Sequence, residues 1–178
     1  PEPYQERQYP LPAALPREAA EVLALSYYNA EAGGQGFTCE PAGVGDYRQV
    51  VSSSRFATFS EAEDYFETIY TPAVLSELLQ PLSDEGTGES TAYYREGAGD
   101  TLLIMGYPYE SIIPQSGYTF TEPQARPDGS LQFGGICVIV TDDLGEPLPE
   151  GAGRLYYSPT VLVETPDGWR VQQANPPF

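Results

Sequence analysis

The chain has 178 residues, of which 26 are acidic and 8 are basic, so its formal net charge is -18. A surface of this sign repels nucleic-acid backbones and anionic headgroups, and we expect neither nucleic acid as a partner nor direct membrane insertion. Histidine and lysine are both absent, which excludes Ser–His and Cys–His pairs, imidazole metal sites, Schiff bases and P-loops. Any enzyme chemistry would have to use carboxylates, tyrosines and arginines.

The length suits one domain with its own core. Residues 1–15 are rich in proline and polar residues, which predicts an extended spacer. Residues 16–178 are then expected to form a single domain. The chain begins without methionine, and two readings stay open: a front that carried an export signal or lipid anchor, or an ordinary disordered terminus.

A first helix is predicted over residues 16–32 by apolar residues at helical spacing, and Gly33-Gly34 end it. Its apolar face would hold five residues: Ala19, Val22, Leu23, Tyr27 and Ala30.

Two short helices in succession are predicted over residues 58–81. Ser60 and Glu63 have the spacing of a capping box at the start of the first helix. Thr71 suits the cap of the second helix, because the Pro72 that follows needs no N–H at a first helical position and disfavours a helical residue before it. Pro81 would end this helix, after a stripe of leucines: Leu75, Leu78, Leu79 and Leu82.

Strands are predicted mainly in the second half of the chain, where apolar and polar residues alternate. Residues 37–51 predict a loop and one short strand, and residues 91–105 predict two strands around a glycine-rich turn. Further hairpins are expected about residues 127–129 and 166–168, and Gly134-Gly135 suggest a bulge. The order, helices first and then an antiparallel meander of five or six strands, predicts an α+β fold with the N-terminal helices packed on one bent sheet.

Two acidic groups could be read as sites. Asp142, Asp143 and Glu146 could face a hard cation, but their spacing is not that of an EF-hand loop, and we expect a solvated turn. Glu63 and Glu67 lie one helical turn apart on a polar face, where solvated surface is again expected. We therefore assign no catalytic residue, no metal ligand and no cofactor.

A loop between two predicted strands, residues 105–118, is the strongest candidate for binding. It combines tyrosines, isoleucines and prolines with one acid, and such loops lose little side-chain freedom on binding. We expect its partner-binding residues to be Tyr107, Tyr109, Glu110 and Tyr118. The other reading is that the isoleucines tuck under the sheet and the tyrosines shield them.

Cys39 and Cys137 are the only cysteines. In an oxidising compartment they could form a disulfide across a long loop, and in a cytosol they would be two buried thiols.

Three segments carry a family resemblance. FATFSEAEDYFETIYTPAVLSELL is similar to a family segment in which an F-x-S-x-x-E-x-x-x-Y/F helix leads into a Y-T-x-x-x-L helix. YYREGAGDTLLI occupies the place of Y-x-x-x-G-x-L-Y strands, and VLVETPDGWRVQQANPPF is similar to a closing D-G-W-x-V strand. The chain thus resembles, from about Pro16 onward, the DL-endopeptidase inhibitor (IseA-type) family of Gram-positive extracytoplasmic proteins.

The resemblance implies a secreted or lipid-anchored domain with a cystatin-like roll and no catalysis. Family members block NlpC-type peptidoglycan endopeptidases by occupying the active-site cleft, so a cell-wall endopeptidase is the expected protein partner. D-G-W-x-V also ends cystatin-like and nuclear-transport-factor-like rolls, so it argues for an α+β roll more than for one function. Because helices over a bent sheet can enclose a pocket, the alternative is a small-molecule-binding or enzymatic α+β roll with a pocket of carboxylate and tyrosine.

Overall fold

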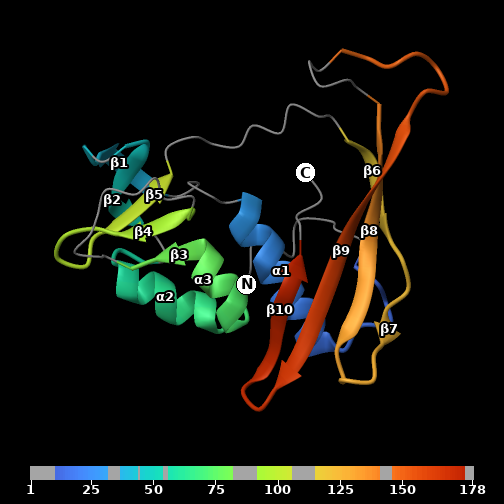
Figure 1. Cartoon of the computed structure of the whole chain (residues 1–178), viewed down its shortest axis with the longest axis horizontal. Coiled ribbons are helices and arrows are strands. Elements are labelled where there is room, and N and C mark those ends of the chain that lie inside the picture. The colour runs from blue at the N-terminus through green and yellow to red at the C-terminus, as the bar shows by residue number, and fades with distance from the viewer. Residues whose placement is uncertain are drawn as a thin grey trace. The chain divides into compact units, whose positions relative to one another are not determined.

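The structure is a computed structural model of the chain, and it confirms the α+β fold class (Figure 1). It describes residues 11–31, 37–43, 45–53, 56–81, 92–105, 115–140 and 146–174. In helices and strands, the side chains of residues 27–31, 52–53, 115–118 and 137 lie outside this description.

The described strands form two five-stranded sheets, so the expectation of one continuous meander was wrong. The chain divides into two compact units: Glu31–Tyr109, and Pro1–Ala30 together with Glu110–Phe178. Alternation of apolar residues is a local signal, whereas the choice of pairing partner depends on residues far apart in the chain. The assignment of residues 16–178 to a single domain stays a prediction, since compact units of one chain can fold together or apart.

The unit Glu31–Tyr109 places two helices on a sheet with the order β1-β2-β5-β4-β3. All pairs are antiparallel except β3 with β4. Its elements are β1 (Phe37–Pro41), β2 (Tyr47–Ser53), α2 (Phe59–Glu67), α3 (Pro72–Leu78), β3 (Leu79–Gln80), β4 (Tyr94–Glu96) and β5 (Leu102–Met105).

Two expectations for this unit were wrong. Residues expected to form a loop are the strand β1, paired with β2. The second helix ends at Leu78 and not at Pro81, because Leu79 turns to extended backbone and pairs with Tyr94. Leu79 is thereby buried in the sheet, so one leucine of the predicted helical stripe is a strand residue.

The helix α2 begins at a capping box two residues earlier than predicted. The Glu61 N–H donates to the Thr58 hydroxyl at 3.2 Å, and the Glu61 carboxylate accepts from the Thr58 N–H at 3.4 Å. The sequence offers two overlapping boxes, and the chain uses Thr58–Glu61 rather than Ser60–Glu63 because Ser60 has another partner. Its N–H and its hydroxyl both donate to Oδ1 of Asp100, at 2.9 and 3.0 Å.

Aromatic rings fill the layer between α2 and its sheet. Phe66, on α2, lies 4.9 Å from Tyr94 of β4 and 5.5 Å from Phe56, measured between ring centroids. All three side chains are buried, together with Phe59 and Ile69. The amphipathic face of the helix therefore packs on a closed apolar layer.

The second unit places one helix against a sheet with the order β10-β9-β8-β6, with β7 also paired to β8. Its elements are α1 (Arg17–Glu31), β6 (Gln115–Phe120), β7 (Gln124–Ala125), β8 (Leu131–Ile139), β9 (Arg154–Thr165) and β10 (Gly168–Ala174). Both predicted hairpins are confirmed. Each turns at a glycine in the left-handed region, Gly129 with φ 83° and Gly168 with φ 105°, where a side chain would be strained.

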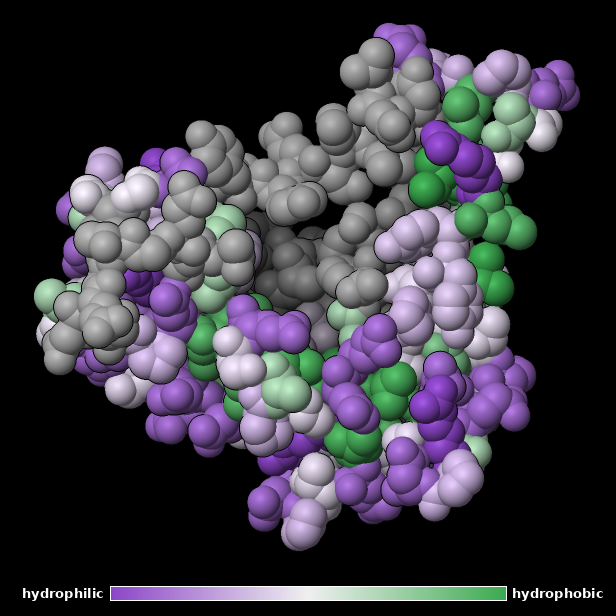
Figure 2. All heavy atoms as spheres, viewed as in Figure 1, coloured by the Kyte–Doolittle hydropathy of each residue, from purple (hydrophilic) through white to green (hydrophobic). Residues whose placement is uncertain are grey.

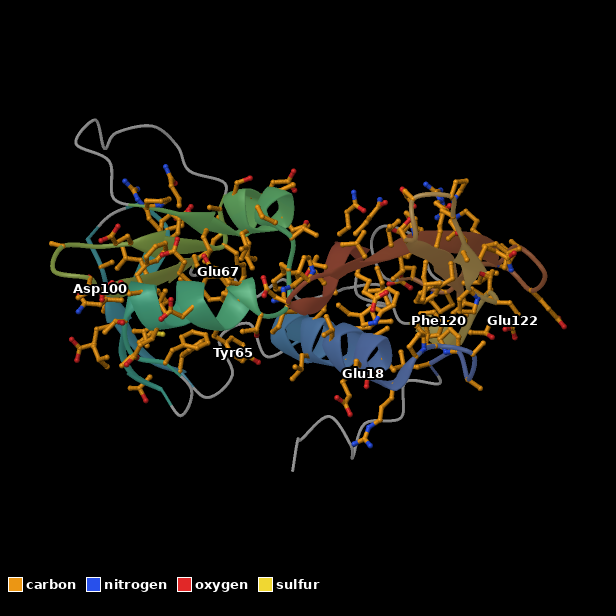
Figure 3. The ribbon with its side chains drawn as sticks, turned by 90° about the horizontal axis from the view of Figure 1, so that it is seen from below. Glu18, Tyr65, Glu67, Asp100, Phe120 and Glu122 are labelled. Carbon is orange, nitrogen blue, oxygen red and sulfur yellow. The ribbon has the colours of Figure 1, made fainter. Side chains whose placement is uncertain are left out.

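The helix α1 lies along the sheet of its own unit (Figures 1 and 3). Its buried residues include Ala19 and Leu23, as predicted, while Val22 is half-buried. On the strands, the fully buried side chains alternate along β9, at Ser158, Thr160 and Leu162, as expected for one covered face. The buried side chains of Ala24, Phe133 and Val171 complete this core.

No bulge occurs at Gly134-Gly135. The register of β8 with β9 runs unbroken from Leu131 opposite Leu162 to Ile139 opposite Arg154. Glycine is required at position 134 for a different reason: a Cβ there would lie 2.1 Å from the ring of Tyr157. An absent side chain thus makes room for an aromatic ring on the neighbouring strand.

Candidate protein-binding surface

The predicted binding residues fall largely outside the described residues. Tyr107, Tyr109 and Glu110 are not described. Tyr118 lies in β6 opposite Cys137, and its side chain is not described. Their role in binding stays a prediction.

The predicted tyrosine loop leads directly into β6, and this fixes where its end joins the sheet. The first residue of β6, Gln115, pairs with Ile139, the last residue of β8. Ile139 in turn pairs with Arg154, the first residue of β9. The loop therefore joins the sheet at the end where β8 stops and β9 starts. We call residues 136–140 and 154–157 the ribbon end.

The ribbon end carries four of the five exposed large apolar side chains among the described residues, and the fifth is Val51 in the other unit. Leu155 is 78% exposed, Tyr157 51%, Tyr156 45% and Val140 37%. Figure 2 shows hydrophobic residues gathered over this region, at the upper right. A cluster of this kind at the end of a sheet is typical of an interaction site.

The sequence did contain a signal for this surface. Successive side chains of a strand point to opposite faces, so a sheet that buries one face covers only alternate residues. Leu155, Tyr156 and Tyr157 are three large apolar residues in succession, and a half-buried strand cannot bury all three. The hairpin was predicted from the turn after this strand, and the three successive apolar residues were not used to predict an exposed surface.

One tyrosine of the ribbon end is held against the strand beside it. The Tyr157 ring lies over Gly134, which is on β8, two residue pairs away from the Ile136–Tyr157 pair. Half of the Tyr157 side chain still faces solvent. A ring already fixed by packing loses little conformational entropy on binding, which favours a role in recognition.

The strand β10 pairs with only part of β9. On its β10 side, pairing runs only from Thr165 opposite Gly168 to Thr160 opposite Ala174. Among the described residues, no strand pairs with Arg154–Pro159 on that side. The sequence after β10 contains Pro176 and Pro177, which have no N–H to extend a ladder.

The described residues offer no buried carboxylate for acid–base chemistry, since the only buried charged side chain among them is that of Arg95. Its guanidinium carbon lies 5.9 Å from the centre of the Tyr47 ring, and the Tyr47 hydroxyl donates to the Ala92 carbonyl. Arg95 and Tyr47 lie on neighbouring parts of one sheet face, where the stacked pair stabilises the sheet.

The perturbed carboxylates are surface caps and turns. Hydrogen bonds from Ser60 lower the pKa of Asp100, which lies at the start of α2 (Figure 3). Hydrogen bonds from the Ser130 hydroxyl and N–H lower the pKa of Asp128 in its turn. A general acid needs a raised pKa, so both shifts go in the direction opposite to that needed for proton donation.

Of the acidic residues considered as sites, three are described by the structure and two are not. Glu63 is half-buried and Glu67 is exposed on α2, and Glu146 is exposed. Asp142 and Asp143 are not described. Over the ranges that the structure describes, no three possible ligands cluster to hold a metal ion.

Cys39 is half-buried in β1 and carries a free thiol. Burial raises its pKa, and the nearby Arg48 opposes this shift. A raised pKa leaves little thiolate at neutral pH, so this is a poor nucleophile. Cys137, in β8, lies opposite Tyr156 of β9, and the side chain of Cys137 is not described. The structure gives no support for a bridge between the two cysteines, which stays a prediction.

The structure explains the first of the resembling segments. With threonine in place of serine, its F-x-S-x-x-E-x-x-x-Y spacing falls on Phe56, Thr58, Glu61 and Tyr65. Thr58 and Glu61 form the capping box of α2, and the rings of Phe56 and Tyr65 are 5.7 Å apart. This spacing thus starts a helix and anchors its entry, which is a structural role.

Among the described residues, no helix has both the length and the apolar composition needed to span a bilayer. Compared with known proteins, the chain matches no model of a protein family and no curated protein sequence.

Proposed function

We propose that the protein is a non-catalytic binding protein of the cell envelope that inhibits peptidoglycan DL-endopeptidases by occluding their active site. The observation that carries the proposal is the exposed ribbon end, which lies where the tyrosine loop enters the sheet. Its exposed apolar and aromatic side chains are of the kinds that dominate protein interfaces. The resemblance of three segments, in chain order, to the inhibitor family supplies the identity of the partner.

The residue chemistry supports a binding role over catalysis. The chain has no histidine and no lysine, and its described carboxylates are all at least partly exposed. Its net charge of -18 favours a basic partner. Occlusion requires only a complementary surface, so it needs none of the missing residue types.

The proposed location is outside the cytoplasmic membrane of a Gram-positive bacterium, where the protein is secreted or held by a lipid anchor. The support is the same resemblance, since peptidoglycan endopeptidases act outside that membrane.

A small-molecule-binding or enzymatic roll is the alternative function. It would use a buried carboxylate and a tyrosine hydroxyl beneath the helices. Tyr93 has a pKa raised by burial, which is the strongest observation in its favour. Against it, the layer beneath α2 is packed with Phe56, Phe66 and Tyr94, and a raised tyrosine pKa means that the basic phenolate forms only at high pH.

The experiment is a wall-lysis assay with purified NlpC-type endopeptidase, cell walls and an excess of this protein. We expect slower loss of turbidity with wild-type protein. Replacement of Tyr109 and Glu110 by alanine tests the predicted loop, and replacement of Leu155 and Tyr157 by threonine tests the ribbon end. Val51→Thr is the matched control, because Val51 is 45% exposed in a strand of the other unit.

The outcomes separate the claims. If wild-type protein leaves lysis unchanged, the inhibitor function is wrong. If lysis slows but neither double variant weakens the effect, the function stands and the binding surface lies elsewhere. Weakening by the Tyr109/Glu110 variant alone would confine the surface to the loop.

A further inference from the structure

We propose that one face of the sheet in the second unit binds an extended, uncharged glycan. We call it the glutamine face, and we define it by four side chains: Gln124, Gln132, Tyr157 and Gln173. The inference does not rest on the proposed function, because it concerns a polysaccharide and not the protein partner. It gives the molecule a second ligand of a different chemical class.

The strand register places three glutamines in one row across the sheet. Gln124 of β7 is opposite Gln132 of β8, and Gln132 is in turn opposite Val161 of β9. Val161 also pairs with Gln173 of β10. Residues paired across strands share one face of a sheet, so the three amides project from the same side. Neighbouring strands are about 4.8 Å apart, which is close to the length of one sugar unit in an extended glycan.

The glutamine side chains are accessible, and their chemistry suits sugar hydroxyls. Gln124 and Gln173 are exposed, and Gln132 is half-buried. Each side-chain amide has two N–H donors and a carbonyl acceptor, while a sugar hydroxyl can both donate and accept. Gln124 uses one of its donors on the Glu122 carbonyl, at 3.3 Å, which orients this side chain and leaves its carbonyl oxygen for a ligand.

An aromatic ring lies beside the row of amides. Tyr157 shares this face, because it is an even number of residues from Val161 on the same strand. Its ring reaches over Gly134, the next position on this face of β8 after Gln132, with ring atoms 2.1 and 2.2 Å from where a Cβ would lie. The side chain is still 51% exposed. A ring that packing has already fixed offers an apolar surface to the C–H groups of a sugar at little entropic cost.

The face has little charge, which favours a neutral ligand. On this side β8 contributes the even-numbered residues 132–138 and β9 the odd-numbered residues 155–165, and none of them is charged. Arg170 of β10 shares the face opposite Val163, and its guanidinium donates to the carbonyls of Asp167 and Trp169. A basic peptide would be drawn to the acidic parts of the surface instead, and a second copy of the chain would bring another net charge of -18.

The probes are two uncharged, extended glycans, the β-1,4-linked hexamers of N-acetylglucosamine and of glucose. Nitrogen-15 NMR spectra of the protein are followed during titration with each hexamer. We expect the side-chain amide signals of Gln124, Gln132 and Gln173 to shift together. The control ligand is the α-1,6-linked hexamer of glucose, which has similar hydroxyls and no charge but does not form an extended, flat chain. We expect it to bind more weakly.

Protein variants give the second comparison. Gln132→Met with Gln173→Met removes two amides at nearly unchanged side-chain length, so we expect affinity for the β-linked hexamer to fall about tenfold. Tyr157→Thr removes the ring and keeps a strand-forming residue, and a similar loss is expected. Gln49→Met is the matched control, because Gln49 is a half-buried strand residue of the other unit. Circular dichroism shows that each variant has folded.

Four results would overturn the inference. Neither β-linked hexamer could shift the glutamine signals, even in large excess. The α-linked hexamer could bind equally well, which would mean that the face does not recognise an extended chain. The Gln132/Gln173 variant could keep full affinity, which would place binding elsewhere. Sedimentation could show a dimer that this variant dissolves, which would make a second copy the occupant.

The inference and the proposed function fail separately. Glycan binding together with unchanged wall lysis would support the glutamine face and reject the inhibitor. Slowed lysis without glycan binding would support the inhibitor and reject the glutamine face. Because Tyr157 belongs both to the ribbon end and to the glutamine face, the Gln132/Gln173 variant is the one that tests the glutamine face alone.

Discussion

At the scale of single residues, polar atoms in the core show where the fold is not optimised. The Thr160 hydroxyl is buried in the sheet of the second unit, and no described residue is its hydrogen-bond partner. A buried hydroxyl without a partner keeps its desolvation cost and gains nothing in return. Its position on the covered face, between Ser158 and Leu162, is one that an apolar side chain of equal shape would suit.

We predict that Thr160→Val raises the free energy of unfolding by about 1 kcal/mol, because it replaces the unsatisfied hydroxyl by a methyl group. The measurement is urea unfolding followed by tryptophan fluorescence. Thr165→Val is the matched control: the Thr165 hydroxyl donates to the Gly168 carbonyl at 2.7 Å, so this change should destabilise the protein. Equal effects of the two substitutions would contradict the argument.

Asp100 is a residue whose contribution depends on pH. It lies in the left-handed region with φ 62°, and its carboxylate accepts two hydrogen bonds from Ser60 at the start of α2. These bonds lower its pKa, since they favour the charged form. A lowered folded-state pKa means that the stabilisation is present above the unfolded value of about 3.9 and is lost as pH falls through the folded value.

We predict that Asp100→Asn lowers the melting temperature at pH 7 and that the difference from wild type shrinks as the pH falls below the unfolded value. Asparagine tolerates the left-handed region, so this variant removes the charge without new backbone strain. The comparison is thermal unfolding between pH 7 and pH 2, with Asp64→Asn on the exposed face of α2 as control. A difference that stayed constant with pH would exclude the carboxylate as its cause.

At the scale of elements, the correct predictions rest on residues whose effect on the backbone is local. Glycines that adopt the left-handed region made both hairpins of the second unit predictable from sequence, and Pro72 did the same for the start of α3. The cap of α2 was placed two residues late, because two boxes overlap and the choice depends on Asp100, forty residues away. Gly134 was read as a bulge because sequence does not show that the Tyr157 ring lies above it.

The Gly134–Tyr157 contact gives a prediction for the β8–β9 pair. A Cβ at residue 134 would meet ring atoms of Tyr157 at 2.1 and 2.2 Å, so Gly134→Ala must displace the ring. We expect it to cost about 1–2 kcal/mol in wild type and clearly less in a Tyr157→Ala background. Urea unfolding of the four proteins of this double-mutant cycle measures the coupling. Additive effects would show that the two residues do not compete for space.

At the scale of the whole molecule, composition limits the possible chemistry but says little about the layout of the chain. The lack of histidine and lysine argues against most kinds of catalysis, and the non-catalytic function stays a proposal. The division into two sheets was missed, because β2 precedes α2 in sequence yet pairs with β5, which follows α3. The ribbon end was missed as well, although Leu155–Tyr157 stand together in the sequence.

The net charge of -18 gives the last prediction, which concerns the rate of association. A strongly acidic protein attracts a basic partner over long distances, and added salt screens this attraction. We predict that the association rate constant with a basic NlpC-type endopeptidase falls by about tenfold or more between 0.05 and 0.5 M sodium chloride, while the dissociation rate constant changes much less. Surface plasmon resonance at several salt concentrations measures both rates. Sodium sulfate at matched ionic strength is the control, because a screening effect depends on ionic strength and not on the identity of the anion. A dissociation rate that carried most of the salt effect would mean that the charge acts within the bound complex, and the steering role assigned to the acidic surface would then be wrong.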